Sequence, residues 1–227
     1  TLATLTGIRV IGQFRRKDMA LGGQGAPLVP AFHQHVFTLP YQDVFVVNIG
    51  GIANITYLPK THEPDNSTQI LGFDTGPGNA LLDDWFKENH PADSTLKRFD
   101  ENGHWGASGQ VNFALLRHLL SDAYFSLPAP KSTGREYFNL NWLFAQLTDF
   151  AIKHQQSLAP QNVQATLVAF TAASIAAEIK NLTQCGTIYL CGGGVHNSML
   201  VAQLEQVLNT PEKSSFELLS TKERHID

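Results

Sequence analysis

Two apolar segments are joined by a pair of glycines near the start of the chain. Residues 44–49 and 52–58 are rich in β-branched and aromatic side chains, and Gly50 and Gly51 separate them. Apolar runs that flank a Gly-Gly pair are typical of a β-hairpin. We therefore expect an antiparallel strand pair, to which the remaining elements must be added.

The rest of the sequence predicts strands that alternate with helices. Further strands are expected at residues 8–14, 70–73, 187–191 and 216–219, and loops at 22–27 and 61–67. Helices are expected at residues 28–37, from residue 80, at 111–120 after an N-cap at Ser108, at 140–155, at 161–182, and at 198–208 after an N-cap at Asn197. Because later strands alternate with helices, right-handed crossovers and parallel pairing should follow the hairpin. The predicted fold class is α/β, a mixed sheet with helices on its faces.

Length and charge exclude several classes of protein. The 227 residues are enough for one large domain or two small ones. A formal net charge of −4 argues against nucleic acid or an anionic membrane as the main partner. No uninterrupted apolar run approaches about 18 residues, so we predict no membrane-spanning segment. Cys185 and Cys191 lack metal-ligand spacing, and Cys191 is expected to be a buried free thiol, which fits a reducing compartment.

Two glycine-rich turns are candidates for anion binding. Residues 48–54 contain the Gly-Gly pair, where backbone N–H groups can approach an anion because no Cβ blocks them, although a plain type I′ turn is an alternative. Residues 192–197 follow an apolar strand and open a helix, so they could border a phosphate or a flat ring. The alternative is a tight strand–helix junction. Neither a dinucleotide-binding GxGxxG pattern nor a Walker lysine is present.

A third glycine-rich turn, residues 74–79, carries the candidate carboxylate. Asp74 is expected at the end of a strand and ahead of a helix, whose dipole should keep it ionised with a low pKa. It could accept a proton from water or a sugar hydroxyl, or hold a Mg²⁺-bound water, with a helix cap as the alternative. Asp83 and Asp84 are interpreted as helix surface. Together the three turns place phosphate-binding backbone and an acid along one sheet edge, which favours phosphoryl transfer.

Several long segments, in this order, closely resemble the anhydro-N-acetylmuramic acid kinase family. They are residues 14–18, 21–30, 48–54, 73–79, 130–138 and 191–194. The resemblance implies an actin/hexokinase-like ATPase fold of two RNase H-like lobes, in a cytoplasmic bacterial enzyme of peptidoglycan recycling. It implies that ATP, with Mg²⁺ bridging its phosphates, phosphorylates O6 of 1,6-anhydro-N-acetylmuramic acid while water opens the anhydro ring. The product would be N-acetylmuramate 6-phosphate, and the enzyme a homodimer.

The same resemblance implies roles for individual residues. Asp74 matches the base that activates the attacking water, and no protein metal cage is expected. Residues near the sugar would be Arg15, Arg16 and Asp18. Residues near the nucleotide would be Asn48, Gly50, Gly51, Asn54, Gly76, Gly78, Asn79, Gly192, Gly193, Gly194 and Asn197. Residues 131–136 match the family without an assigned role.

The family pattern also predicts how the chain is organised. Residues 1–43 would be a remnant of the N-terminal lobe and the inter-lobe segment, and residues 44–227 the C-terminal RNase H-like lobe, truncated at its end. The first phosphate loop and the C-terminal sugar-binding helix have no counterpart. We therefore expect this chain alone to lack kinase activity, to keep a partial nucleotide site and to expose apolar surface. Alternative functions are another sugar kinase of this fold, disfavoured by residues 15–30, or a non-catalytic actin-like module, disfavoured by the Asp74 turn.

Overall fold

The computed structural model describes residues 2–23, 25, 28–61, 69–90, 98–211, 213–224 and 226. Within these ranges five strands form one sheet: β1 (Val44–Ile49), β2 (Ile52–Leu58), β3 (Leu71–Pro77), β4 (Cys185–Cys191) and β5 (Ser215–Ser220). The predicted loop at 61–67 lies outside the described residues except for Thr61, as do Gln24, Ala26 and Pro27 of the predicted loop at 22–27.

The sheet has the strand order β3-β2-β1-β4-β5. β2 pairs antiparallel with both β1 and β3, whereas β1 pairs parallel with β4 and β4 parallel with β5. Among these strands, β2 alone therefore runs against the others. The hairpin, the parallel pairs and the mixed α/β sheet are confirmed.

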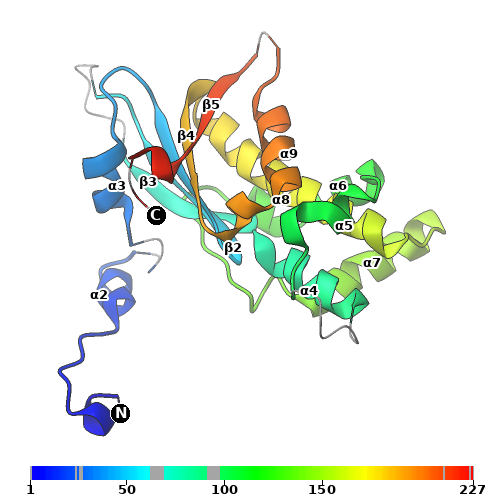
Figure 1. Cartoon of the computed structure of the whole chain (residues 1–227), viewed down its shortest axis with the longest axis horizontal. Helices are drawn as coiled ribbons and strands as arrows, with labels where there is room; N and C mark the ends of the chain where they lie inside the picture. Colours follow the sequence, from blue (N-terminus) through cyan, green and yellow to red (C-terminus); the bar gives the residue numbers. More distant parts are fainter. Residues whose placement is uncertain are drawn as a thin grey trace.

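The described residues also form helices, most of which lie against one face of the sheet or the other (Figure 1). They are α1 (Leu2–Thr6), α2 (Phe14–Ala20), α3 (Pro30–Phe37), α4 (Asn79–Asn89), α5 (His104–Ala107), α6 (Phe113–Leu120), α7 (Leu140–His154), α8 (Pro160–Leu182) and α9 (Ser198–Leu208). Short 3₁₀ turns occupy Glu101–Gly103, Ala123–Ser126, Gly193–His196 and Thr221–Arg224. Helices α4 to α9 gather on one side of the sheet and α3 lies on the other (Figure 1).

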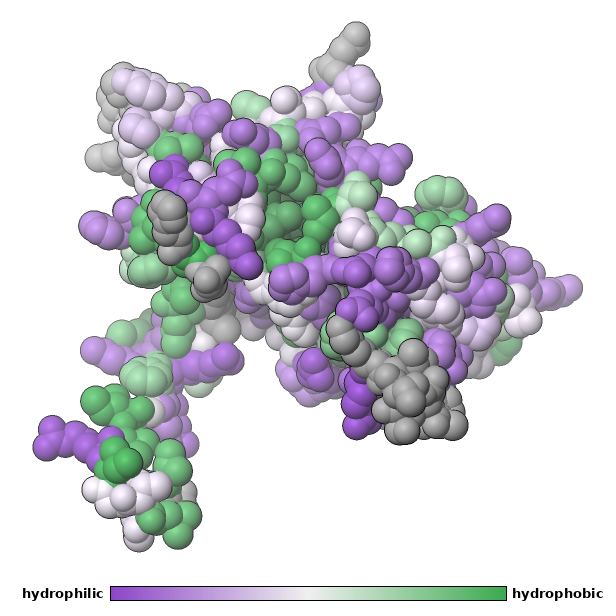
Figure 2. Space-filling model, viewed as in Figure 1, coloured by the Kyte–Doolittle hydropathy of each residue, from purple (hydrophilic) through white to green (hydrophobic). Residues whose placement is uncertain are grey.

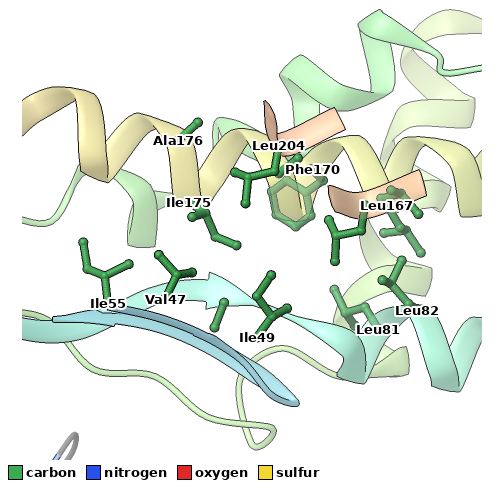
Figure 3. Close-up of a cluster of buried hydrophobic side chains, with 14 of the residues drawn as sticks. Val47, Ile49, Ile55, Leu81, Leu82, Leu167, Phe170, Ile175, Ala176 and Leu204 are labelled. Carbon is green, nitrogen blue, oxygen red and sulfur yellow. The ribbon is translucent and has the colours of Figure 1, made fainter. Parts of the chain in front are cut away.

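The central strand β1 is buried on both faces. Phe45, Val47 and Ile49 belong to the larger core beneath α8, while Val44 and Val46 pack with Phe37 of α3. Figure 3 shows the larger core, with Val47 and Ile49 of the sheet pointing toward side chains of α8. This alternation is the period of a strand that is covered on both faces.

One predicted strand and two predicted boundaries are wrong. Residues 8–14 form no strand, and α2 begins at Phe14; Ile8 and Ile11 are exposed and pair with no strand in the described part of the chain. The predicted helix at 111–120 begins at Phe113, because the side chain of Asn112, not Ser108, accepts from the Leu115 N–H. β3 does not end before Asp74 but continues to Pro77, because β2 supplies pairing partners that far.

α8 is long and apolar enough to cross a membrane, and 83% of its apolar window is buried inside the protein. Its neighbours are strands of the sheet and helices α4, α5, α6 and α9. Burial on this scale is the packing of a central core helix. Its hydrophobicity is therefore accounted for by contacts within the chain.

The segment before α3 is the part of the described chain with the most exposed apolar side chains. Leu5, Ile8, Ile11, Phe14 and Leu21 are between 67% and 84% exposed. Apolar atoms gather over this segment, which extends away from the sheet (Figures 1 and 2). The observation agrees with the expected exposure of apolar surface.

Candidate functional site

The three glycine-rich turns meet at one edge of the sheet. β1, β3 and β4 run in the same direction, so their carboxyl ends lie together, and the β1–β2 turn lies at the same edge. The turn after β3 is bonded to the hairpin: Gly78 N donates to Gly51 O at 3.0 Å, and Asn79 N to Gly50 O at 2.8 Å. The predicted convergence of these turns is confirmed.

The turn after β4 packs closely against the end of β1. Gly192 has a φ of 86°, in the left-handed region that favours glycine, and a Cβ there would lie 2.7 Å from the Ile49 carbonyl oxygen. A Cβ on Gly194 would overlap the side chain of Ile49. Asn79 Nδ2 donates to the same Ile49 carbonyl at 3.1 Å and so ties the third turn to this strand. These glycines are therefore required by close packing of the three turns.

Replacing Gly78 by Ala should destabilise the junction of the turns by about 1–3 kcal/mol. The added methyl would overlap the Gly50 carbonyl oxygen and lie 3.2 Å from Ala53 N, and neither backbone atom can rotate away. Gly193→Ala is a matched control for stability, because its methyl would meet no described atom closer than Asn79 Nδ2 at 3.5 Å. Denaturant unfolding measures both. Equal stability of the two variants would contradict the packing argument.

A row of polar side chains crosses the sheet beside the hairpin turn. Asn48 is paired with Asn54 on β2, and Asn54 with Asp74 on β3. Their neighbours Val47, Ile55 and Phe73 belong to the core under α8, so by alternation the polar row lies on the opposite face. The β2–β3 register shifts at Ala53/Asn54, next to Asp74. Bulges of this kind occur next to active sites, where they change the direction of a side chain.

The Asp74 carboxylate is held through one of its two oxygens. Ser132 Oγ donates to Asp74 Oδ2 at 2.9 Å, and Thr133 N donates to the same oxygen at 3.0 Å. In the described ranges nothing donates to Oδ1. The carboxyl group is thus fixed in orientation and has one oxygen available for a ligand.

The pKa of Asp74 is raised, which contradicts the expected low value. Burial is the largest cause, because desolvation disfavours the charged form; the hydrogen bonds from Thr133 and Ser132 and the nearby charge of Arg15 oppose it. The carboxyl group lies within β3 and is 5% exposed, not at an open helix N-terminus. A raised pKa makes an ionised Asp74 a stronger proton acceptor than an ordinary aspartate.

The loop that holds Asp74 is anchored from behind by a buried ion pair. Asp74 N donates to Lys131 O at 3.0 Å. Lys131 directly precedes the two residues that bind the carboxylate. Lys131 Nζ lies 2.6 Å from Glu178 Oε1 of α8, and the two side chains are 3% and 12% exposed. Tyr124 OH also donates to Asp74 O, at 2.7 Å. Backbone and side chain of Asp74 are therefore both fixed.

A cavity of about 450 Å³ opens beside the turn after β4. It is lined by Asn79, Leu82, Asp83, Phe99, Asp100, Glu101, Asn102, Gly193, His196 and Asn197. Asn197 also caps α9, since its Oδ1 accepts from Leu200 N at 3.0 Å, as predicted. Asp83 was expected on the helix surface, but it is half-buried at this cavity, and burial raises its pKa. A cavity of this size can accept a small organic ligand.

The candidate sugar residues lie on α2. Asp18 Oδ2 accepts from Gly25 N at 2.7 Å, so this side chain stabilises the loop that follows α2. Arg15 and Arg16 line a second hollow of about 410 Å³ with Phe14 and Leu28. The charge of Arg15 reaches Asp74 and lowers its pKa, which links this helix electrostatically to the sheet edge. Their contact with a sugar stays a prediction.

The described residues contain no group of three or more His, Cys, Asp or Glu side chains placed to hold a metal ion. Cys185 and Cys191 are free within those ranges. Cys191 is only half-buried, because it is the last residue of β4; partial burial raises its pKa. The expected free thiol is confirmed, but its full burial is wrong.

Sequence reasoning assigned no role to residues 131–136, although they contribute directly to the site. Ser132 and Thr133 bind Asp74, and Lys131 anchors them. The sequence feature that could have indicated this role is a pair of adjacent hydroxyl residues in a loop that also contains a lysine and an arginine.

Comparisons with known proteins agree with the motifs. The family described as anhydro-N-acetylmuramic acid kinase matches residues 1–227. An anhydro-N-acetylmuramic acid kinase of Colwellia psychrerythraea is 57% identical over 232 residues, which cover 100% of this chain and 57% of that protein. The protein of that name from Shewanella pealeana is 46% identical, over 100% of this chain and 56% of its own length. The chain thus spans little more than half of these relatives. Among solved structures, an activator of 2-hydroxyisocaproyl-CoA dehydratase from Clostridium difficile aligns with a TM-score of 0.43 and 13% identity, over 81% of this chain and 56% of its own.

Proposed function

The chain belongs to the anhydro-N-acetylmuramic acid kinase family, and from this we propose that the full-length protein phosphorylates 1,6-anhydro-N-acetylmuramic acid with ATP. Water adds to the anomeric carbon, and the bond from that carbon to O6 breaks. O6 attacks the γ-phosphorus of ATP, and the bond to the β-phosphate oxygen breaks. The products are N-acetylmuramate 6-phosphate and ADP. The proton of the attacking water goes to Asp74.

The single observation that carries this proposal is the geometry of the Asp74 carboxylate. Ser132 and Thr133 fix Oδ2, and Oδ1 has no described donor, so Oδ1 is the atom that would accept the proton. Burial raises the pKa of Asp74, which strengthens it as a base. A positioned base with a tuned pKa typically contributes about 10²- to 10⁴-fold to a rate.

The nucleotide would bind across the glycine-rich turns. We place its adenosine in the 450 Å³ cavity beside Asn79, Gly193 and Asn197, with Gly192 and Gly194 at its border. Its phosphates would reach the turn at Gly50 and Gly51, beside Asn48, Asn54, Gly76 and Gly78. Mg²⁺ would neutralise charge on the phosphates. Its ligands would be oxygens of phosphate and water, which Mg²⁺ accepts readily. The described residues contain no cluster of carboxylates that would hold it. Arg15, Arg16 and Asp18 of α2 would face the sugar.

We further propose a cytoplasmic enzyme of peptidoglycan recycling that forms a homodimer. The two free cysteines are compatible with a reducing compartment. The mass of the full-length protein in solution, measured by light scattering, tests the dimer.

Phosphorylation of two sugars by the full-length protein tests the function. We expect transfer from ATP to 1,6-anhydro-N-acetylmuramic acid, with a product heavier by one phosphoryl group and one water, and little transfer to N-acetylglucosamine. Preferred turnover of N-acetylglucosamine would instead indicate a different sugar kinase. Absence of turnover with both sugars would favour a non-catalytic module.

A further inference from the structure

The guanidinium group of Arg135 lies directly over the hairpin turn. A Cβ built on Gly51 would be 2.9 Å from both Arg135 Nε and Nη2. The contact joins the loop after Pro130 to the β1–β2 turn, and it involves the charged end of the side chain, not its stem. Gly51 therefore leaves the room that the guanidinium group fills.

Arg135 is exposed and forms no ion pair within the described ranges. This distinguishes it from Lys131 of the same loop, which is buried against Glu178. The charge of Arg135 opposes the rise in the pKa of Asp83, a residue that lines the cavity beside the turn. An arginine left without a carboxylate partner keeps its donors available for another anion.

The turn beneath Arg135 offers donors of the same kind. The carbonyl oxygens of Gly50 and Gly51 accept from the N–H groups of residues 78–80. The N–H groups of Gly50 and Gly51 themselves have no acceptor among the described atoms. With its carbonyls engaged and its amides free, the turn presents donors next to a guanidinium fork, an arrangement that suits a phosphate.

We propose that Arg135 is a phosphate-binding residue, which grips the terminal phosphates of the nucleotide against the Gly50–Gly51 turn. The inference rests on the proposed function for the identity of the nucleotide. The planar guanidinium group of Arg135 can bond two phosphate oxygens at once, which an ammonium group cannot do. Gly51 serves the same purpose, since any side chain there would displace the guanidinium.

Titration of the full-length protein with ATP, ADP and AMP tests this role. Arg135→Ala should weaken ATP binding by about 10- to 100-fold, the range for a lost charge-assisted contact, and leave AMP binding within about twofold. The ATP affinity of Arg135→Lys should lie between those of the normal protein and Arg135→Ala. Arg117→Ala, which removes an exposed arginine from α6, is the matched control and should bind all three nucleotides normally.

A second variant tests the geometry without removing the charge. Gly51→Ala adds one methyl, whose three nearest atoms all belong to the guanidinium end of the Arg135 side chain, so the protein should stay folded. It should weaken ATP binding in the normal protein but have little further effect when combined with Arg135→Ala, because neighbouring groups in one interaction are not additive. Full additivity would overturn the proposal.

The outcomes separate this inference from the proposed function. Arg135-dependent ATP binding without phosphorylation of the anhydro sugar would support the residue and contradict the function. Phosphorylation with an unchanged ATP affinity in Arg135→Ala, or with an altered KM for the sugar alone, would overturn the role of Arg135. Equal loss of AMP and ATP binding would overturn it as well.

Discussion

Replacing Asp74 by Asn is expected to lower the turnover number of the full-length protein by about 10²- to 10⁴-fold, the range for loss of a general base. Asn fills the same space, and its amide oxygen can still accept from Ser132 and Thr133, so the loop should stay in place. The amide cannot take up the water proton. Steady-state kinetics with the anhydro sugar measures the loss.

Stability should not fall with activity in this variant. Burial disfavours the charged form of Asp74 and raises its pKa, so a neutral replacement removes an unfavourable charge at neutral pH. Asp149→Asn, on the exposed side of α7, is the matched control and should keep normal turnover. Unchanged turnover in Asp74→Asn would exclude Asp74 as the base.

The pH profile gives an independent test of the same residue. The base acts when it is deprotonated, so kcat/KM for the sugar should fall as the pH drops through the pKa of Asp74. Because that pKa is raised, the acid limb should lie above the ordinary value of 3.8. Asp74→Asn should lack this limb, whereas an acid limb retained in the variant would belong to another group.

The sheet and the meeting of its turns could be predicted because both depend on local patterns. The β-branched and aromatic side chains of residues 44–49 and the Gly-Gly pair indicate the hairpin, and parallel crossovers bring the carboxyl ends of β1 and β4 to one edge. Asn197 at the start of α9 is a cap whose partner lies three residues away. The hairpin and the cap are determined by neighbours in sequence, and the parallel pairing follows from the general handedness of crossover connections.

The raised pKa of Asp74 could not be predicted in the same way. Its cause is burial, and the residues that contact Asp74 from the tertiary fold, 124 and 131–133, are distant from it in sequence. The contact between Arg135 and Gly51 has the same origin, and so does the partial burial of Asp83. Residues 8–14 show the opposite error: their apolar pattern suited a strand, but a strand needs a pairing partner that the described chain does not provide.

The largest loss of stability is expected from breaking the buried ion pair behind Asp74. Lys131→Ala would leave Glu178 charged and unpaired against the core, at a cost of about 3–5 kcal/mol. Denaturant unfolding should show this as a lower midpoint. Lys87→Ala is the matched control: its partner Asp84 lies 3.2 Å away, but the pair is 37% and 28% exposed, so its loss should cost under about 1 kcal/mol.

A double replacement distinguishes the effect of the two charges on stability from the effect of side-chain volume. Lys131→Met combined with Glu178→Leu removes both charges and keeps most of the volume, so it should unfold close to the normal midpoint, unlike either single replacement. The backbone carbonyl of residue 131 still accepts from Asp74 N, and Ser132 and Thr133 still reach the carboxylate. If the single variant Lys131→Ala were as stable as the normal protein, the pair would not anchor this loop, and the fixed orientation of Asp74 would have to come from Ser132, Thr133, Tyr124 and the sheet.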